Sequence, residues 1–157
     1  MPSLFPHRRL CLLAHNVRSL WNVGSFFRTC DAFKVEKLYL TGYTGHPPRK
    51  EISKTALGAE DSIPWEHEKD PMLVVQKLKQ DGWSIVPLEI TDDAVDLASF
   101  DPPEKVCLIV GHELAGVPDE ILQLADVTVK IPMLGTKKSL NVAVAAGIAL
   151  HHLRYRS

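Results

Sequence analysis

The stretch of residues 131–152, IPMLGTKKSLNVAVAAGIALHH, constrains the fold of this chain more than any other part of the sequence. It opens with a polar loop that contains Pro132 and Gly135 and continues into small and apolar residues from 142 to 150. Ser139 stands where its hydroxyl could accept a hydrogen bond from a free N–H group at the start of a helix. That helix is apolar on nearly all sides, which predicts burial all round. Ligands of open α/β folds bind at such polar loops between a strand and a helix, so the stretch predicts a ligand site.

Segments that suit strands alternate along the whole chain with segments that suit helices. The expected strands are residues 9–14, 36–40, 83–88, 105–110 and 127–131. The expected helices are residues 22–33 with Asn22 as the cap, 50–57, 71–81, 118–124 and the last one, with a single helical turn at 93–99. Because the strands are continuously apolar, they should form a parallel sheet that helices cover on both faces. The prediction is a doubly wound α/β fold of about five or six strands in a single domain, residues 1–157.

The composition is that of an ordinary globular protein. The chain has 157 residues, of which 45% are hydrophobic and 24% charged, and its formal net charge is −1. No apolar run reaches the roughly 18 residues of a membrane span, and the short run after Arg9 favours a first strand over a signal peptide. Three widely spaced cysteines in apolar segments, Cys11, Cys30 and Cys107, argue against a disulfide framework. We therefore expect a cytoplasmic protein.

Several common sites are missing from the sequence. No G-x-G-x-x-G follows the first strand, and there is neither a P-loop nor an HExxH motif. The histidines do not pair with cysteines at zinc spacing, and His112-Glu113 has no second metal ligand beside it, so we expect no metal. Basic groups fall in clusters along the chain, and acidic groups gather at 60–70 and 92–104. This charge pattern is explained about equally well by an ordinary solvent-exposed surface and by a surface that contacts nucleic acid.

Three loops after expected strands carry groups suited to chemistry. In the first, residues 16–31, Gly24 and Arg28 share one helical face. Gly24 would let another group approach the backbone, and Arg28 offers a planar fork for a phosphate or carboxylate. The alternative is an ion pair between Arg28 and a nearby carboxylate such as Asp31, within a mostly buried helix.

The second and third loops have equally simple structural alternatives. In residues 110–118, Gly111 and Gly116 allow tight turns, and Glu113 could accept hydrogen bonds from backbone N–H groups of neighbouring loops or from an arginine. This loop could also be a structural turn with a helix-capping acid. In the third loop, the backbone of residues 131–134 could bind a purine while Ser139 and Asn141 orient a sugar or phosphate, or the segment could simply be a capped helix after a turn.

Taken in order, the three loops resemble the motifs of a known family. The chain reads N-x-G-x-x-x-R, then G-x-E-x-x-G-V-P, then I-P-M-x-G-x-x-x-S-L-N-V-A-V-A-A. These are similar to the three motifs of the SPOUT RNA methyltransferases, in particular the TrmH-like (SpoU) 2′-O-ribose branch, and the resemblance covers about residues 9–153. His112 occupies the variable position of the second motif. We expect neither the separate RNA-binding domain nor the long terminal helices that many relatives have.

The resemblance implies a fold, a cofactor and a set of site residues. The family fold is a parallel α/β sheet whose C-terminal part forms a deep trefoil knot, within which S-adenosylmethionine binds. By motif, the expected cofactor-binding residues are Leu88, Glu89, Gly111, Glu113, Ile131, Met133, Ser139 and Leu140. The residues matched to catalysis are Arg28, Asn22, Glu113, Ser139 and Asn141. Arg28 matches the family's essential arginine and would act on the ribose 2′-hydroxyl directly, through an RNA phosphate, or by positioning the nucleotide.

The resemblance also implies partners. Family members are homodimers in which the last helix and the first helical region pack across a two-fold axis and the active site borrows from both subunits. RNA would lie across the dimer, and the basic residues expected to contact it are Arg8, Arg9, Arg18, Arg28, Arg49, Lys50 and Lys54. The favoured substrate is tRNA at a D-loop guanosine, with the tRNA wobble ribose and rRNA as alternatives. A catalytically inactive RNA-binding relative and an unrelated nucleotide-binding α/β enzyme are the competing functions.

Overall fold

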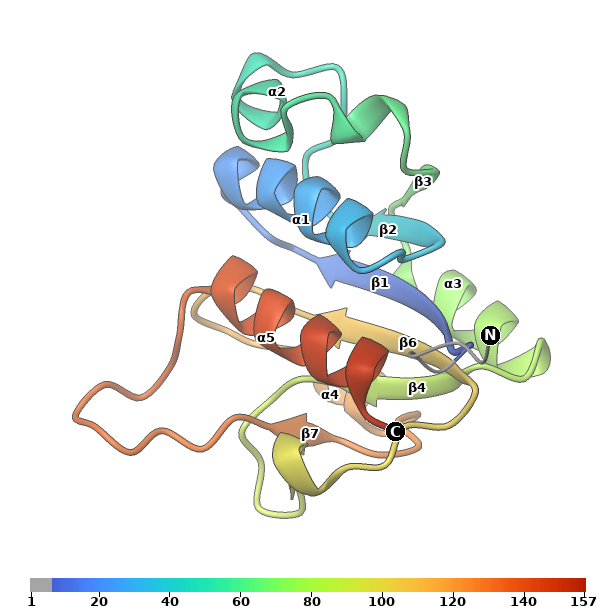
Figure 1. Ribbon diagram of the computed structural model, residues 1–157, viewed down its shortest axis with the longest axis vertical. Helices are drawn as coiled ribbons and strands as arrows, with labels where there is room; N and C mark the ends of the chain where they lie inside the picture. The colour runs from blue at the N-terminus through green and yellow to red at the C-terminus, as the bar shows by residue number, and fades with distance from the viewer. Residues whose placement is uncertain (1–6) are drawn as a thin grey trace.

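The computed structural model describes residues 7–157 (Figure 1). Helices and strands alternate along this part of the chain, as the sequence predicts. The elements are β1 (Arg9–His15), α1 (Leu20–Ala32), β2 (Lys37–Thr41), α2 (Lys50–Ala56), the 3-10 turn η1 (Ala59–Asp61), β3 (Trp65–Glu68), α3 (Pro71–Gln80), β4 (Ser84–Pro87), β5 (Val95–Asp96), the 3-10 turn η2 (Leu97–Ser99), β6 (Lys105–Val110), α4 (Asp119–Leu122), β7 (Val129–Lys130) and α5 (Val142–Tyr155).

The main sheet has five parallel strands in the order β3-β2-β1-β6-β4. Successive residues of a strand point to opposite faces, and both faces of β1 are buried. Leu10 and Leu12 belong to one hydrophobic core with α1, α2 and α5, whereas Cys11 and Leu13 belong to a second core with α3 and α4. In Figure 1 the helices α1 and α5 lie side by side in front of the sheet. The predicted two-sided parallel sheet is confirmed, and its two cores explain why the strands are continuously apolar.

The C-terminal part of the chain interleaves with the connection between β4 and β6. Strand β7 pairs in parallel with β5, which belongs to that connection, in a separate two-stranded sheet. The backbone N–H of Glu89 donates to the carbonyl of Val129 at 2.9 Å. Further on, Nε2 of His152 lies 2.8 Å from the carbonyl oxygen of Phe100. The end of the chain is therefore held by a segment that lies some fifty residues earlier.

Two helix starts differ from the sequence predictions. The cap of α1 is Ser19, whose hydroxyl accepts from the N–H of Asn22, so Asn22 lies inside the helix. The cap of α5 is Asn141, whose Oδ1 accepts from the N–H groups of Ala143 and Val144 at 2.8 and 3.2 Å. Ser139 stands too early in the chain to reach those groups, so its predicted capping role is wrong.

The strand predictions miss the edge strand β3 and make the strand before the last helix too long. Strand β3 was not expected, because its sequence WEHE is polar and lies at an edge where one side stays open to water. The expected strand at 127–131 shrinks to β7 and lies outside the main sheet. The expected turn at 93–99 contains β5 before the 3-10 turn η2, and α4 is shorter than residues 118–124.

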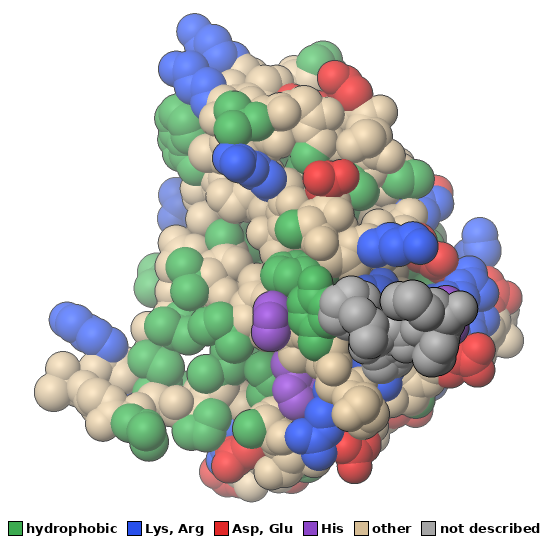
Figure 2. Space-filling view, in the orientation of Figure 1, with side chains coloured by type: hydrophobic (Ala, Val, Ile, Leu, Met, Phe, Trp, Pro, Cys, Tyr) green, Lys and Arg blue, Asp and Glu red, His purple; other side chains and the backbone are tan. Residues whose placement is uncertain are grey.

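Helix α5 is not buried all round, contrary to the prediction. One face packs against the sheet through Ala146, Ala149 and Leu150, but Val144 is 52% exposed and Ile148 is 43% exposed. Figure 2 shows hydrophobic side chains gathered on this open face of the molecule. The helix is apolar on two sides and the single chain covers only one of them. No helix in the described part of the chain is long and apolar enough to cross a membrane.

Candidate active site

A cavity of about 300 Å³ opens at the carboxyl end of the sheet, where the chain leaves β4 and β6. This is the edge at which open α/β sheets bind ligands. Its walls come from three segments: the residues after β4, the loop after β6, and the loop before α5. Every residue predicted to bind a cofactor lines it, namely Leu88, Glu89, Gly111, Glu113, Ile131, Met133, Ser139 and Leu140. Three polar or basic residues that the prediction omitted also line it, namely His112, Lys130 and Lys138, as does Gly116.

The loop after β6 folds back on itself at two glycines. A Cβ on Gly111 would lie 2.4 Å from the carbonyl oxygen of Gly116, so no larger residue fits there. Gly116 has φ +73°, in the left-handed region that favours glycine. Its Cα also faces Glu89, whose Oε2 accepts from the N–H of Val117 at 2.8 Å. The tight turns predicted for Gly111 and Gly116 are confirmed, and a carboxylate from the end of β4 holds them in place.

His112 shapes the same loop through its ring. Its Nδ1 accepts from the N–H groups of Leu114 and Ala115, both at 2.9 Å. An acceptor at Nδ1 means that this nitrogen carries no proton, so the neutral ring has its proton on Nε2. This role cannot be predicted from the sequence, because a histidine that accepts from its own turn has no distinctive spacing. His112 therefore organises the cavity wall.

Glu113 joins this loop to the start of α1. Its carboxylate accepts from the N–H of Arg18 at 3.1 Å and from the N–H of Ser19 at 3.3 Å. Partial burial alone would raise the pKa of Glu113. Hydrogen bonds from backbone N–H groups, first its own and then those of Arg18 and Ser19, outweigh the burial, and the pKa lies below its ordinary value. Of the two predicted partners for Glu113, backbone groups and an arginine side chain, the backbone groups are confirmed.

Asn22 and Asn141 join the first and third loops. The Nδ2 of Asn141 donates to Oδ1 of Asn22 at 3.4 Å, across α1 and α5. Ser139 is exposed at the cavity wall and makes no side-chain hydrogen bond within residues 7–157. The structure therefore gathers four of the residues matched to catalysis, namely Asn22, Glu113, Ser139 and Asn141, around the cavity or at its rim.

Arg28 lies apart from the other four. It is exposed on α1, does not line the cavity, and has no hydrogen bond or ion pair with any residue from 7 to 157. The helix around it buries Phe26, Phe27 and Cys30 as expected, but the alternative pairing of Arg28 with Asp31 is wrong. Helix α2 packs directly against Gly24, one turn earlier on α1. A Cβ on Gly24 would lie 1.9 Å from Oγ1 of Thr55 and 2.3 Å from the carbonyl oxygen of Ile52. Gly24 thus serves the packing of α1 against α2.

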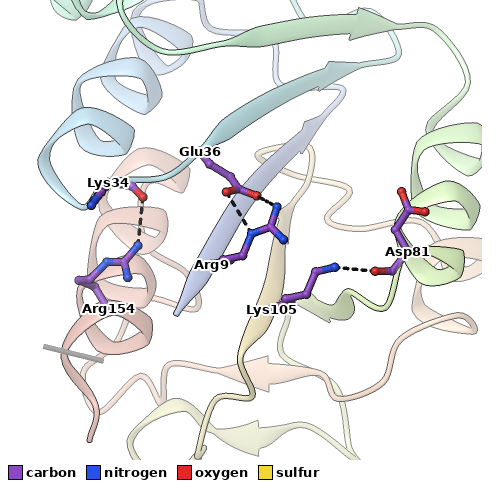
Figure 3. Close-up of polar contacts among 6 residues, drawn as sticks. All are labelled: Arg9, Lys34, Glu36, Asp81, Lys105 and Arg154. Carbon is purple, nitrogen blue, oxygen red and sulfur yellow. Dashed lines mark hydrogen bonds and ion pairs between the residues drawn. The ribbon is translucent and has the colours of Figure 1, made fainter. Parts of the chain in front are cut away.

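The basic residues divide between the two ends of the sheet. Arg18, Arg49, Lys50 and Lys54 lie in the loops and the helix at the carboxyl end and are exposed. Arg8 and Arg9 lie at the amino end and have partners: Arg8 donates to the carbonyls of Pro103, Leu153 and Arg156, and Arg9 pairs with Glu36 at 2.8 Å. Figure 3 shows this amino end, with Arg9 beside Glu36 and Arg154 reaching the carbonyl of Lys34. The structure does not bring Arg8 and Arg9 to the cavity.

Comparison with known proteins identifies the fold and the family. The chain matches the model of the SpoU rRNA Methylase family over residues 9–151. It is 34% identical over 143 residues to the tRNA (guanosine(18)-2′-O)-methyltransferase of Aquifex aeolicus, covering 90% of this chain and 67% of that protein. It is 32% identical over 146 residues to the 23S rRNA (guanosine(2553)-2′-O)-methyltransferase RlmP of Bacillus subtilis, covering 93% of this chain and 58% of that one. An AdoMet-bound rRNA methyltransferase from Sinorhizobium meliloti has a similar structure, with a TM-score of 0.86 and 28% identity over 92% of this chain and 55% of that chain.

The interleaved parallel sheet with its carboxyl-end cavity is therefore that of an α/β knot methyltransferase. More closely, the chain belongs to the SpoU family of S-adenosylmethionine-dependent RNA 2′-O-methyltransferases. It spans only 55% to 67% of the length of the relatives described above. Within residues 7–157, no group of three histidine, cysteine, aspartate or glutamate side chains lies together as metal ligands.

Proposed function

We propose that this chain methylates a ribose 2′-hydroxyl of RNA with S-adenosylmethionine bound in the cavity at the carboxyl end of the sheet. The observation that carries the proposal is that the residues matched to cofactor binding, which come from three separate loops, line one cavity. Calorimetric titration with S-adenosylhomocysteine tests it. Binding that Gly111→Val abolishes would support the proposal, and wild-type protein that binds no S-adenosylhomocysteine would overturn it.

The residues of the cavity fit such a cofactor. Its volume is at the lower end of the range for small-molecule sites. Leu88, Ile131 and Leu140 provide apolar walls for a flat purine, and the absence of a side chain at Gly111 lets two backbone segments come together beside it. Backbone groups of these loops would read the purine edge. When bound, S-adenosylmethionine supplies a methyl group on a positively charged sulfur.

Arg28 is the residue we propose to act on the nucleotide. An arginine side chain is effectively always protonated, so it is a poor base. Arg28 instead holds an RNA phosphate and stabilises the negative charge that develops on the 2′-oxygen, whose proton passes to solvent water. Its freedom from ion pairs within residues 7–157 leaves the guanidinium available for this role. Arg28→Ala should lower methyl transfer at saturating cofactor by more than about tenfold, equivalent to about 1.4 kcal/mol; a smaller loss would exclude a central role.

We further propose that a second copy of the chain completes the site. The exposed apolar face of α5 contains Val144 and Ile148 and needs a cover, and Arg28 lies outside the cavity of its own chain. In a two-fold dimer packed through α5, Arg28 of one subunit acts at the cavity of the other. Val144→Asp should convert a dimer to a monomer in sedimentation, whereas Leu73→Asp, at an equally exposed site on α3, should not.

Mixed dimers test the shared site directly. Arg28→Ala and Gly111→Val subunits are each inactive, but a mixed dimer has one site with an intact cavity and an intact Arg28. Random mixing makes half of the dimers mixed, so activity should return to about one quarter of wild type. No recovery after verified subunit exchange would show that Arg28 acts within its own chain.

The proposed substrate is tRNA, at a D-loop guanosine. The similarity to the Aquifex aeolicus enzyme, which is named for guanosine 18 of tRNA, supports this choice, and the similarity to RlmP keeps rRNA as the second candidate. Labelled-methyl transfer to total tRNA and to rRNA, followed by mass-spectrometric mapping of the nucleotide, separates the two. Methylation of rRNA alone would overturn the tRNA assignment.

The proposed RNA contacts are Arg18, Arg28, Arg49, Lys50 and Lys54. Lysine and arginine contacts to phosphates release counterions, so RNA affinity should fall steeply as salt rises. Arg8 and Arg9 are left out of this path because their guanidinium groups already have partners at the other end of the sheet. Lys54→Ala should reduce the salt dependence of binding, whereas Arg9→Ala should not.

A further inference from the structure

Two aromatic side chains stand exposed on segments that follow β1 and β2 at the carboxyl end of the sheet. Tyr43 is 58% exposed and Trp21 is 48% exposed, although large aromatic side chains usually lie mostly buried. Tyr43 comes from the loop after β2, and Trp21 from the first turn of α1. Neither residue belongs to the motifs that identify the family, and neither was predicted to have a role.

The backbone under Tyr43 is held rigidly. Asn16, in the left-handed conformation with φ 55°, accepts at Oδ1 from the N–H of Tyr43 at 3.0 Å. The hydroxyl of Thr44 accepts from the N–H of Val17 at 3.0 Å and lies within 2.7 Å of the carbonyl of Thr41. The two loops are therefore tied together, and the ring of Tyr43 projects from a fixed base into solvent.

Trp21 is fixed in a similar way. Its carbonyl accepts from the hydroxyl of Thr55 at 2.8 Å, which ties the start of α1 to α2. The Nζ of Lys54 lies 5.6 Å from the centre of the Trp21 ring, within the range of a cation–π contact. The aromatic ring and the positive charge are thus offered together at one place on the surface.

The ring of Tyr43 is close to the cavity, and Trp21 lies on a helix whose start is bound by a cavity residue. The ring of Tyr43 meets the ring of His112 edge to face, with 6.4 Å between centres, and His112 lines the cavity. Arg18, three residues before Trp21, is exposed while its backbone N–H is bound by Glu113, another lining residue. Figure 2 shows further Lys and Arg side chains at the upper end of the molecule, the end at which Figure 1 places α2.

Exposed aromatic rings among lysines and arginines suit unpaired nucleotides. Bases stack on aromatic side chains while cations contact the phosphates, and bases in a duplex are not available for such stacking. We propose that Tyr43 and Trp21 stack unpaired bases that flank the methylated ribose, so that the substrate is a single-stranded or splayed-out loop of RNA. This inference rests on the proposed RNA methyltransferase function and specifies the form of RNA that the site accepts.

Binding measurements on the full chain test this inference. The probes are a single-stranded RNA oligonucleotide and the duplex of the same sequence, with affinity measured by fluorescence anisotropy in the presence of S-adenosylhomocysteine. Tyr43→Ala should weaken single-strand binding by about five- to a hundredfold and leave duplex binding within twofold. Tyr43→Phe, which keeps the ring, should bind like wild type. Lys54→Ala should weaken both, because phosphate contacts do not depend on base pairing.

Trp21 offers an independent signal. Single-stranded RNA should quench tryptophan fluorescence. Trp21→Phe should remove most of that quenching, because Trp83 is buried and Trp65 is partly buried and already stacked on His46. Leu73→Ala, which removes an exposed apolar side chain from α3, serves as the control and should not change RNA binding. Equal single-strand affinity of Tyr43→Ala and wild type would overturn the inference, as would a loss of duplex binding of the same size. Failure of wild type to transfer methyl groups to any RNA would instead refute the proposed function, since the affinity comparison does not depend on turnover.

Discussion

Gly116→Ala perturbs the point where Glu89 holds the cavity loop, and its cost follows from two separate contributions. The backbone of Gly116 has φ +73°, where a residue with a Cβ costs about 1–2 kcal/mol. The new Cβ would also lie 2.0 Å from Oε2 of Glu89, so the carboxylate must move and lose its hydrogen bond to Val117. A hydrogen bond to a charged group contributes about 1.5–3 kcal/mol. Gly116→Ala should therefore lower the free energy of unfolding by about 2.5–5 kcal/mol.

Two other glycines separate these contributions. Gly58 also has a positive φ, +94°, but an added Cβ would meet nothing within 4 Å, so Gly58→Ala should cost only the strain of about 1–2 kcal/mol. Gly135 has neither constraint, and Gly135→Ala should change stability by less than about 0.5 kcal/mol. The free energy of unfolding is measured by urea denaturation, and calorimetry with S-adenosylhomocysteine reports damage confined to the cavity.

A double-mutant cycle with Glu89→Ala completes the test. Once the carboxylate is gone, Gly116→Ala should cost only the strain of about 1–2 kcal/mol. The coupling between Gly116 and Glu89 should then equal the contribution of the lost hydrogen bond. The reasoning is refuted if Gly116→Ala costs no more than Gly58→Ala in both stability and S-adenosylhomocysteine affinity.

Three further predictions concern single side chains. His112→Ala should weaken S-adenosylhomocysteine binding about tenfold by calorimetry, because the N–H groups of Leu114 and Ala115 lose their acceptor; His112→Asn, which offers another acceptor, should lose less. The pKa of Glu113 is lowered in the folded protein, so its ionised carboxylate stabilises the fold at any pH above the ordinary glutamate pKa of about 4.3. This contribution disappears as the pH falls through the lowered pKa. The difference in free energy of unfolding between wild type and Glu113→Gln should therefore shrink below about pH 4. A difference that stays constant with pH would contradict this prediction. Arg154→Lys should lower the free energy of unfolding by about 2–4 kcal/mol in urea, because the guanidinium donates to three backbone carbonyls.

The sequence predicts the walls of the cavity better than the bonds that hold them. Residues such as Gly111 and Met133 lie in motifs whose local order is visible in the chain, and the parallel sheet brings the ends of its strands to one edge. The contact of Glu89 with Val117 joins residues 28 positions apart, and no local pattern announces it. Glu89 is among the predicted cofactor-binding residues and lines the cavity, but the prediction assigned it no such role.

The errors in the prediction have physical causes. Ser139 and Asn141 are both good capping residues, and only the path of the loop determines which one reaches the helix N–H groups. The polar edge strand β3 lacks the apolar run by which the central strands are recognised. An apolar helix face looks the same in sequence whether the chain or a partner covers it, so the apolar pattern alone predicts burial without saying what buries Val144. Only the family resemblance, which implies a dimer contact through the last helix, favours a partner.

The hydrogen bonds around the cavity suggest that the cofactor site is fixed within one chain, whereas the group that acts on the RNA is not. Glu113 holds the second loop to the first, and Asn141 holds the third loop to α1, through bonds that exist within one chain. A cavity braced in this way is preorganised, so cofactor binding requires little ordering. Arg28, by contrast, has no fixed partner within residues 7–157, and its side chain would be ordered only by contact with RNA or a second subunit. We therefore expect Arg28→Ala to leave S-adenosylhomocysteine affinity unchanged while it lowers methyl transfer. An equal loss of both would show that Arg28 contributes to the cofactor site itself.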